Sequence, residues 1–281
     1  MARGPSERGA LGFLYGTAPG RLLLRPLTAR WLSRAAGRFM ESALSRPLIP
    51  GFIRHNHIDM RDYLPEKYRC FNDFFTRRVR PGARPIDPDP QRLIAPCDGR
   101  LSVYAIDESS LFTIKHSRYD VNALLGGDPR GRDFAGGVCL VFRLAVDDYH
   151  RYHYLDDGEK GENRFIPGVL HTVRPIALAH TDVFIQNCRE YTLLQTRGFG
   201  PVAQIEVGAL LVGKISNNQG PGAFRRGEEK GRFLYGGSTI VLLLTPGAAQ
   251  IEDRFWQATA RGEETRVRLG QGIGWARSTA W

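Results

Sequence analysis

Short runs of apolar and β-branched residues, separated by turn-forming residues, dominate the chain from Leu93 onward. Gly, Asp and Asn separate these runs, as expected for strands joined by tight turns. Helical periods are rare here, so we expect a β-dominated core of mostly antiparallel strands, arranged like a sandwich or a barrel. The predicted strands include Leu101–Ile106, Gly137–Leu144, Tyr191–Thr196, Val202–Val207 and Ser238–Leu244.

The N-terminal part has a helical pattern instead. No proline interrupts residues 27–44, and basic residues recur there every four positions, which places them on one side of a helix. The basic side carries Arg30, Arg34 and Arg38, and the apolar side carries Leu32, Ala36, Phe39 and Ala43. Such a helix, with Trp31, lies either in a membrane interface or against the protein's own core, and the pattern does not separate the two.

Two further features divide the chain. A second, shorter helix is predicted from Pro65 to Phe75. Closely spaced prolines between Pro81 and Pro90 then mark an extended linker. We therefore predict an α+β protein with a helical segment at residues 1–80 and a β-rich domain at residues 81–281.

The charge balance adds a class of partner. The formal net charge is +10, which attracts polyanions such as anionic membranes and nucleic acid, although a merely soluble, arginine-rich surface has the same charge. No apolar run approaches the roughly 20 residues that span a bilayer, so membrane contact is predicted to be peripheral. The four cysteines are widely spaced, which argues against a zinc site and favours a reducing cytoplasm.

A serine after two glycines is the first candidate for chemistry. Gly236 and Gly237 precede Ser238 at the start of a predicted strand. Glycines allow backbone angles that other residues avoid, and strain stored in such a turn would help the serine oxygen attack the preceding carbonyl. The alternative is an ordinary Gly-Gly turn, which the local pattern alone favours.

Two other stretches carry reactive side chains. His150 and His153 lie three residues apart, and histidine can act as a general base near neutral pH. A solvated basic loop is the alternative, and a metal pair lacks a clear third ligand. Asp98 precedes Gly99, so it either orients a histidine or belongs to a common Asp-Gly turn.

Together these stretches make the chain resemble the phosphatidylserine decarboxylases, from about Phe52 to Leu244. Their shared order and spacing carry the resemblance. The matching stretches are Phe71–Arg77, Pro81–Ile86, Pro96–Gly99, Asp148–His153, Ile205–Ala209, Val212-Gly213, Gly227–Gly231 and Gly236–Thr239. The chain departs from many bacterial members at Gly236, where they have leucine, and at Leu155, where they have proline. Neither change removes a reacting group.

The resemblance implies a self-cleaving proenzyme. In this family the chain cuts itself at a Gly-Ser bond, here Gly237-Ser238, and the serine becomes a covalent pyruvoyl cofactor. The family pattern implies a triad in which Asp98 orients His153, and His153 activates Ser238. The pyruvoyl group would form a Schiff base with phosphatidylserine and release CO₂ to give phosphatidylethanolamine, with His150 or His153 as the proton donor.

The resemblance also implies partners and a location. The expected partners are phosphatidylserine, an anionic membrane surface at the cytoplasmic face, and the two cleavage chains, with a second copy of the protein as a further candidate. Nucleic acid is not expected, because no binding motif accompanies the charge. Two alternatives stay open: a pyruvoyl-dependent decarboxylase of a soluble amino acid, and a non-catalytic membrane-binding homologue.

Overall fold

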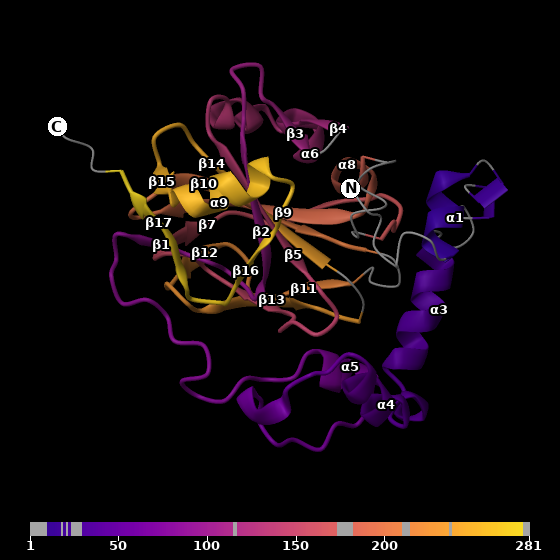
Figure 1. Cartoon of the computed structure of the whole chain (residues 1–281). Coiled ribbons are helices and arrows are strands. Elements are labelled where there is room, and N and C mark those ends of the chain that lie inside the picture. The colour runs from indigo at the N-terminus through magenta and orange to yellow at the C-terminus, as the bar shows by residue number, and fades with distance from the viewer. Residues whose placement is uncertain are drawn as a thin grey trace.

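The computed structural model describes residues 10–17, 19–20, 22–23, 30–114, 117–172, 182–209, 214–235 and 238–277. A β-rich body carries the N-terminal helices along one side and below it (Figure 1). This arrangement confirms the predicted α+β class with an antiparallel β core. The helices are α1 (Ala10–Gly16), α3 (Arg30–Met40), α4 (Leu48–His55), α5 (Phe71–Phe75), α6 (Val121–Leu124), α8 (Val183–Gln186) and α9 (Asp253–Ala260), with short 3₁₀ turns η2 (Ala43–Ser45), η3 (Met60–Asp62) and η4 (Pro129–Phe134).

The largest sheet has the strand order β12-β7-β9-β10-β14-β5-β2-β16, with β8 also paired to β9. Its strands are β2 (Gly99–Ala105), β5 (Val138–Leu144), β7 (Gly158–Lys160), β8 (Arg164–Ile166), β9 (Arg189–Thr196), β10 (Gly200–Val207), β12 (Gly222–Phe224), β14 (Ser238–Leu244) and β16 (Thr265–Val267). The five strands predicted above are confirmed: Ser238–Leu244 with the same bounds, and the other four with small shifts at their ends. Over the described residues the sheet is open, with β12 and β16 at its two ends, so the barrel arrangement is not formed.

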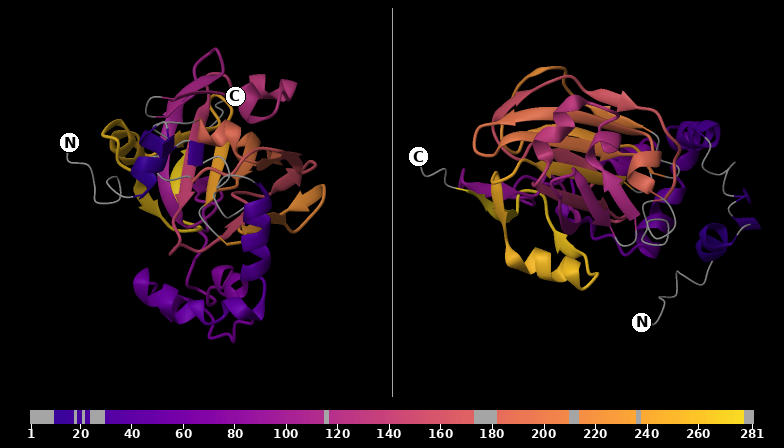
Figure 2. Two further views of the ribbon diagram at one scale, coloured as in Figure 1. Left: turned by 90° about the vertical axis from the view of Figure 1, so that its right-hand side faces the viewer. Right: turned by 90° about the horizontal axis from the view of Figure 1, so that it is seen from above.

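Three smaller antiparallel sheets complete the body. They are formed by β11 (Ile215–Asn217), β13 (Glu229–Phe233) and β6 (Arg151–His153); by β1 (Arg92–Ile94), β17 (Gly272–Ala276) and β15 (Ala249–Ile251); and by β3 (Leu111–Ile114) and β4 (Ser117–Asp120). The layered arrangement of these strands is visible from above (Figure 2).

The central strand β14 is buried on both faces. Ile240, Leu242 and Leu244 belong to one hydrophobic cluster, while Val241 and Leu243 belong to another. Successive side chains of a strand point to opposite faces, so a continuous apolar run supplies two cores at once. The uninterrupted run after Ser238 is therefore explained by its place in the middle of the sheet.

The N-terminal helices differ partly from the prediction. The helix expected over residues 27–44 forms as α3 from Arg30 to Met40, and the side chains of residues 30–34 lie outside the description. The helix predicted from Pro65 is wrong over residues 65–70, because α5 begins only at Phe71. Residues 64–70 before it form neither helix nor strand. Long-range bonds hold both ends of this stretch: the Leu64 N–H donates to Arg78 O at 2.9 Å, and the hydroxyl of Ser45 accepts the Phe71 N–H at 2.9 Å.

Helices α4 and α5 pack against the β-rich body. Ile49, Phe71 and Phe74 form a third hydrophobic cluster together with Tyr149 and Leu269 of the body. Within the described residues, no helix is long and apolar enough to cross a bilayer. The domain boundary near residue 80 stays a prediction.

Candidate active site

Ser238 and Asp98 lie at the same end of three neighbouring strands. Ser238 begins β14, and its backbone is paired with Leu144 of β5. On the other side of β5 runs β2, which begins at Gly99, the residue after Asp98. Adjacent strands lie about 4.8 Å apart, so the two ends are separated by roughly 10 Å. Gly236, Gly237 and the side chain of Ser238 lie outside the described residues.

The carboxylate of Asp98 is held by two groups. Arg84 Nε lies 2.8 and 2.9 Å from its two oxygens and Arg84 Nη2 lies 2.7 Å from Oδ2. The backbone N–H of Leu269 also donates to Oδ1 at 2.9 Å. Asp98 is only 5% exposed, and the arginine supplies the counter-charge that such burial requires. The carboxylate is therefore fixed at the strand end.

His153 lies beside the Asp98 segment. Its backbone N–H donates to Pro96 O at 2.8 Å. No hydrogen bond joins His153 to Asp98 among the described residues, and its Nδ1 is buried without a partner there. Burial lowers the pKa of His153 to about 4, although the charges of Glu229 and Asp98 act in the opposite direction. The imidazole is consequently neutral at pH 7 and able to accept a proton.

His150 occupies an aromatic site next to the segment that leads to Ser238. Its ring centroid lies 3.9 Å from that of Phe75, and its carbonyl accepts the Phe233 N–H at 2.9 Å. Nδ1 lies 2.9 Å from Asp148 O; a carbonyl only accepts, so Nδ1 carries the hydrogen and Nε2 the lone pair. Burial and the charge of Arg77 lower the pKa of His150 to about 3. His150 is thus neutral, and it can donate from Nε2 only after taking up a proton there.

Comparison with known proteins identifies the family. The family model described as phosphatidylserine decarboxylase matches residues 71–275. The chain is 43% identical to phosphatidylserine decarboxylase proenzyme 2 of Clostridium acetobutylicum, over 95% of this chain and 92% of the relative. The chain belongs to the phosphatidylserine decarboxylase family.

Other relatives agree. The phosphatidylserine decarboxylase proenzyme of Ruminiclostridium cellulolyticum is 39% identical over 94% of this chain and 90% of its own length. That of Chlamydia felis is 38% identical over 86% of this chain and 83% of its own length. Membership in the phosphatidylserine decarboxylase family makes the chain an enzyme of the carboxy-lyase class.

For this member of the phosphatidylserine decarboxylase family, the structure brings the Asp98 and His153 segments together and places the Ser238 backbone at the same strand end. It does not connect Asp98 to His153 by a hydrogen bond within the described part. The catalytic roles of these residues and of His150 stay predictions.

Sequence reasoning missed two arginines that support this site. Arg84 neutralises Asp98. The buried Arg77 donates from Nη2 to the carbonyls of Asp147 and Asp148, at 2.9 and 3.2 Å, and so fixes the turn whose Asp148 carbonyl orients His150. Both arginines lie in stretches that carry the family resemblance, Phe71–Arg77 and Pro81–Ile86. Nothing in an Arg-Arg pair or a Gly-Ala-Arg-Pro stretch, however, distinguishes a buried arginine from an exposed one.

Proposed function

We propose that this chain is a phosphatidylserine decarboxylase proenzyme that cuts itself at Gly237-Ser238. The observation that carries the proposal is the family match over residues 71–275. Within that match the Asp98 segment, a neutral His153 and the Ser238 backbone lie at one strand end. The relatives are themselves named proenzymes.

Self-cleavage needs one base and one nucleophile. Neutral His153 takes the hydroxyl proton of Ser238, and the oxygen attacks the carbonyl carbon of Gly237. The Gly237-Ser238 amide is thereby exchanged for an ester, and the serine nitrogen becomes a free amine. Loss of the serine α-proton then expels the Gly237 carboxylate, and water replaces the nitrogen as ammonia. The elimination and the hydrolysis together leave a carbonyl group at position 238.

The residues around position 238 fit such a carbonyl group. Thr239 Oγ1 and His153 Nδ1 are buried without a partner among the described residues, and a hydroxyl or a protonated ring nitrogen can donate a hydrogen bond to a carbonyl. A pyruvoyl group at this position would act as an electron sink for the pair left by departing CO₂. The chain's own residues supply burial, orientation and a histidine able to accept and return a proton.

The first test compares substrates. Purified protein is expected to release CO₂ from phosphatidylserine vesicles at least about 100-fold faster than from free serine, because binding energy from the rest of the lipid contributes to catalysis. Labelled CO₂ and the appearance of phosphatidylethanolamine give the readout. Equal rates on the two substrates would favour a soluble amino-acid decarboxylase. Vesicle binding by an uncut protein without CO₂ release would favour a non-catalytic homologue.

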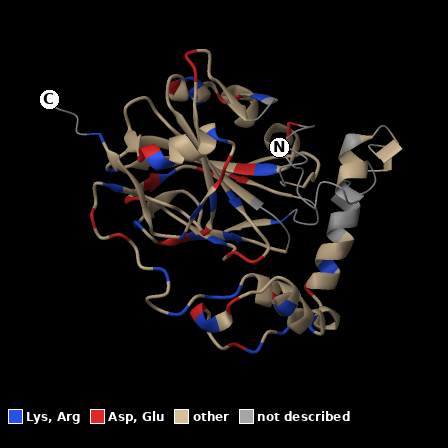
Figure 3. Ribbon diagram, viewed as in Figure 1, with Lys and Arg blue, Asp and Glu red and all other residues tan. Residues whose placement is uncertain are grey.

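Membrane contact is proposed at an apolar patch near α3 and α4. The apolar patch consists of Phe39, Leu44 and Leu48, whose side chains are 43%, 78% and 44% exposed. Basic and acidic residues are interspersed over the rest of the molecule (Figure 3). The formal net charge of +10 would add a general attraction to an anionic membrane, so charge and apolar contact would act together at a peripheral site on the cytoplasmic face.

Leu44→Asp is expected to weaken vesicle binding roughly tenfold, since it replaces an inserting leucine side chain by a charge. Co-sedimentation with phosphatidylserine vesicles measures the change. Val169→Asp alters an exposed apolar residue outside the apolar patch, so it controls for the added charge and should bind as the wild type does. Unchanged binding of Leu44→Asp would place the membrane contact elsewhere.

A further inference from the structure

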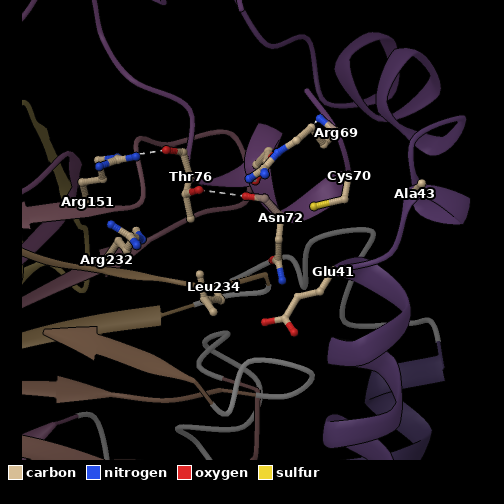
Figure 4. Close-up of a pocket in the computed structure, with 10 residues that line it drawn as sticks. Glu41, Ala43, Arg69, Cys70, Asn72, Thr76, Arg151, Arg232 and Leu234 are labelled. Atoms are coloured by element: carbon tan, nitrogen blue, oxygen red, sulfur yellow. Dashed lines mark hydrogen bonds and ion pairs between the residues drawn. The ribbon is translucent and has the colours of Figure 1, made fainter. Parts of the chain in front are cut away.

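A pocket opens between the N-terminal helices and the end of β13. Its volume is about 510 Å³, and Glu41, Ala43, Asn72, Arg151, Arg232 and Leu234 are among its lining residues. Figure 4 shows the helical residues on one side of this space and the two arginines of the β-rich body on the other. The pocket thus lies where the two parts of the protein meet.

Two arginines of this pocket share one counter-ion. Arg232 of β13 is the direct cross-strand partner of Arg151 of β6, and like charges placed opposite each other destabilise a sheet. Glu229 binds Arg151 Nη1 at 2.9 and 3.0 Å, whereas Arg232 Nη1 is 3.8 Å from it. One carboxylate therefore serves two guanidinium groups, and a positive charge remains at Arg232.

Among the residues that the structure describes, the other charges of the pocket are balanced. Arg69 is paired with Asp73 at 2.8 Å, and Glu41 with Lys214 at 3.2 Å. The unbalanced charge is thus local to Arg232, whose side chain is 35% exposed. A ligand with a single negative charge would neutralise the charge of Arg232.

Asn72 adds a fixed hydrogen-bond donor. Its Oδ1 accepts the Tyr235 N–H at 2.8 Å, which leaves the amide Nδ2 as a donor, with no partner among the described residues. Asn72 and Arg232 lie on either side of Leu234 in the close-up (Figure 4). An anion bound next to Leu234 would accept hydrogen bonds from the guanidinium group of Arg232 in β13 and from the side-chain amide of Asn72 in α5.

The position of the pocket links it to both the membrane and the cleavage site. Ala43 of the lining adjoins Leu44 of the apolar patch. Tyr235, which Asn72 holds, is three residues before Ser238, and three residues span at most about 11 Å. A lipid headgroup bound here would have its acyl chains toward the apolar patch and its serine moiety toward position 238.

We infer that this pocket binds the phosphodiester of the phospholipid headgroup, with Arg232 as the main ligand. The inference rests on the proposed function. A phosphodiester carries one negative charge, which matches the unbalanced charge, and its oxygens suit the paired donors of a guanidinium group. Arg232 is a binding residue in this view, and the processing chemistry does not require it.

The test is Arg232→Gln in the full-length protein. Self-cleavage into two chains is expected to persist, while KM for phosphatidylserine in mixed micelles rises about tenfold and kcat changes less than about threefold, because a uniform binding interaction is lost. Arg232→Lys keeps the charge but loses the paired donors of the guanidinium group, so its KM should lie between those of the wild type and Arg232→Gln. Arg197→Gln removes an equally charged, 82% exposed arginine elsewhere and should leave KM unchanged.

Direct binding separates this inference from the proposed function. Calorimetry on the purified proteins uses two probes: glycerophosphoserine and inorganic phosphate. We expect wild type to bind glycerophosphoserine at least tenfold more tightly than Arg232→Gln does, and more tightly than it binds inorganic phosphate. Equal affinity of wild type and Arg232→Gln for glycerophosphoserine would overturn the inference, as would a preference for inorganic phosphate. Absence of self-cleavage or CO₂ release in the wild type would instead reject the proposed function.

Discussion

Ser238→Ala is expected to leave the protein as one uncut chain of 31.5 kDa, whereas the wild type separates into residues 1–237 and 238–281. Alanine has no hydroxyl, so the Gly237 carbonyl loses its only intramolecular nucleophile at this position. The carbonyl at position 238 cannot form either, so CO₂ release from phosphatidylserine should fall to background. Denaturing electrophoresis and intact mass measure the first effect, and labelled CO₂ measures the second.

A matched control separates chemistry from folding. Ser109→Ala removes a hydroxyl from an exposed serine in a turn, so it should cut and turn over as the wild type does. Ser238→Ala should keep the wild-type thermal transition, because Ser238 starts β14 and the buried residues of that strand are unchanged. A wild-type protein that stays whole, or a Ser238→Ala protein that still separates into two chains, would contradict cleavage at this bond.

The strands could be predicted because their pattern is local. The run from Ile240 to Leu244 is apolar at every position, and it is bounded by glycines on one side and Thr245-Pro246-Gly247 on the other. Such a run fits only a strand that is covered on both faces or a short buried helix, and its length and flanks favour the strand. The same reasoning could not give the sheet order, since pairing between distant strands leaves no local signal.

The helix predicted from Pro65 shows the opposite case. The local sequence of residues 65–75 is compatible with a helix, but long-range contacts decide the conformation of its first part. The bridge between Tyr63 and Val79, and the bond from the Leu64 N–H to Arg78 O, tie the start of this stretch to residues 78–79. Tertiary pairing therefore overrides local propensity at residues 65–70.

Candidate residues were easier to find than their partners. Asp98, His150 and His153 stand out by type and by family pattern, but their surroundings depend on distant segments. Arg84 reaches Asp98 across a proline-rich linker, and Lys230 is fully buried against Glu206 at 2.8 Å. Lysine, arginine and carboxylate side chains are rarely fully buried unless they are paired. The composition therefore gives no sign of which of them lie in the interior, and only the fold reveals it.

His153→Asn is expected to slow self-cleavage by a factor of about 100 or more, the usual contribution of a general base. Asparagine keeps a polar side chain of similar size but cannot accept the serine proton. His55→Asn replaces an exposed histidine on α4 and should cut at the wild-type rate. Freshly synthesised precursor from cell-free translation, followed by electrophoresis over time, provides the rate.

The pH dependence tests the same base without a substitution. Burial lowers the pKa of His153 to about 4, so the imidazole remains a base from alkaline pH down to about pH 5. The cleavage rate should be level over that range with respect to this group and fall tenfold per unit below about pH 4. A midpoint near 6.5, the ordinary value for histidine, would show that the acting base is not a buried histidine.

Stability must be followed in the same buffers. The folded-state pKa values of His150 and His153, about 3 and 4, lie below the unfolded value, so the unfolded chain binds more protons in acid. The free energy of unfolding therefore falls as pH decreases from about 6.5 toward these values, by up to about 1.4 kcal/mol per pH unit for each histidine. Circular dichroism at each pH separates loss of fold from protonation of the base. The loss of rate is assigned to His153 if two results agree. The wild-type rate falls while the fold persists, and the rate of His153→Asn shows no further decrease over the same range.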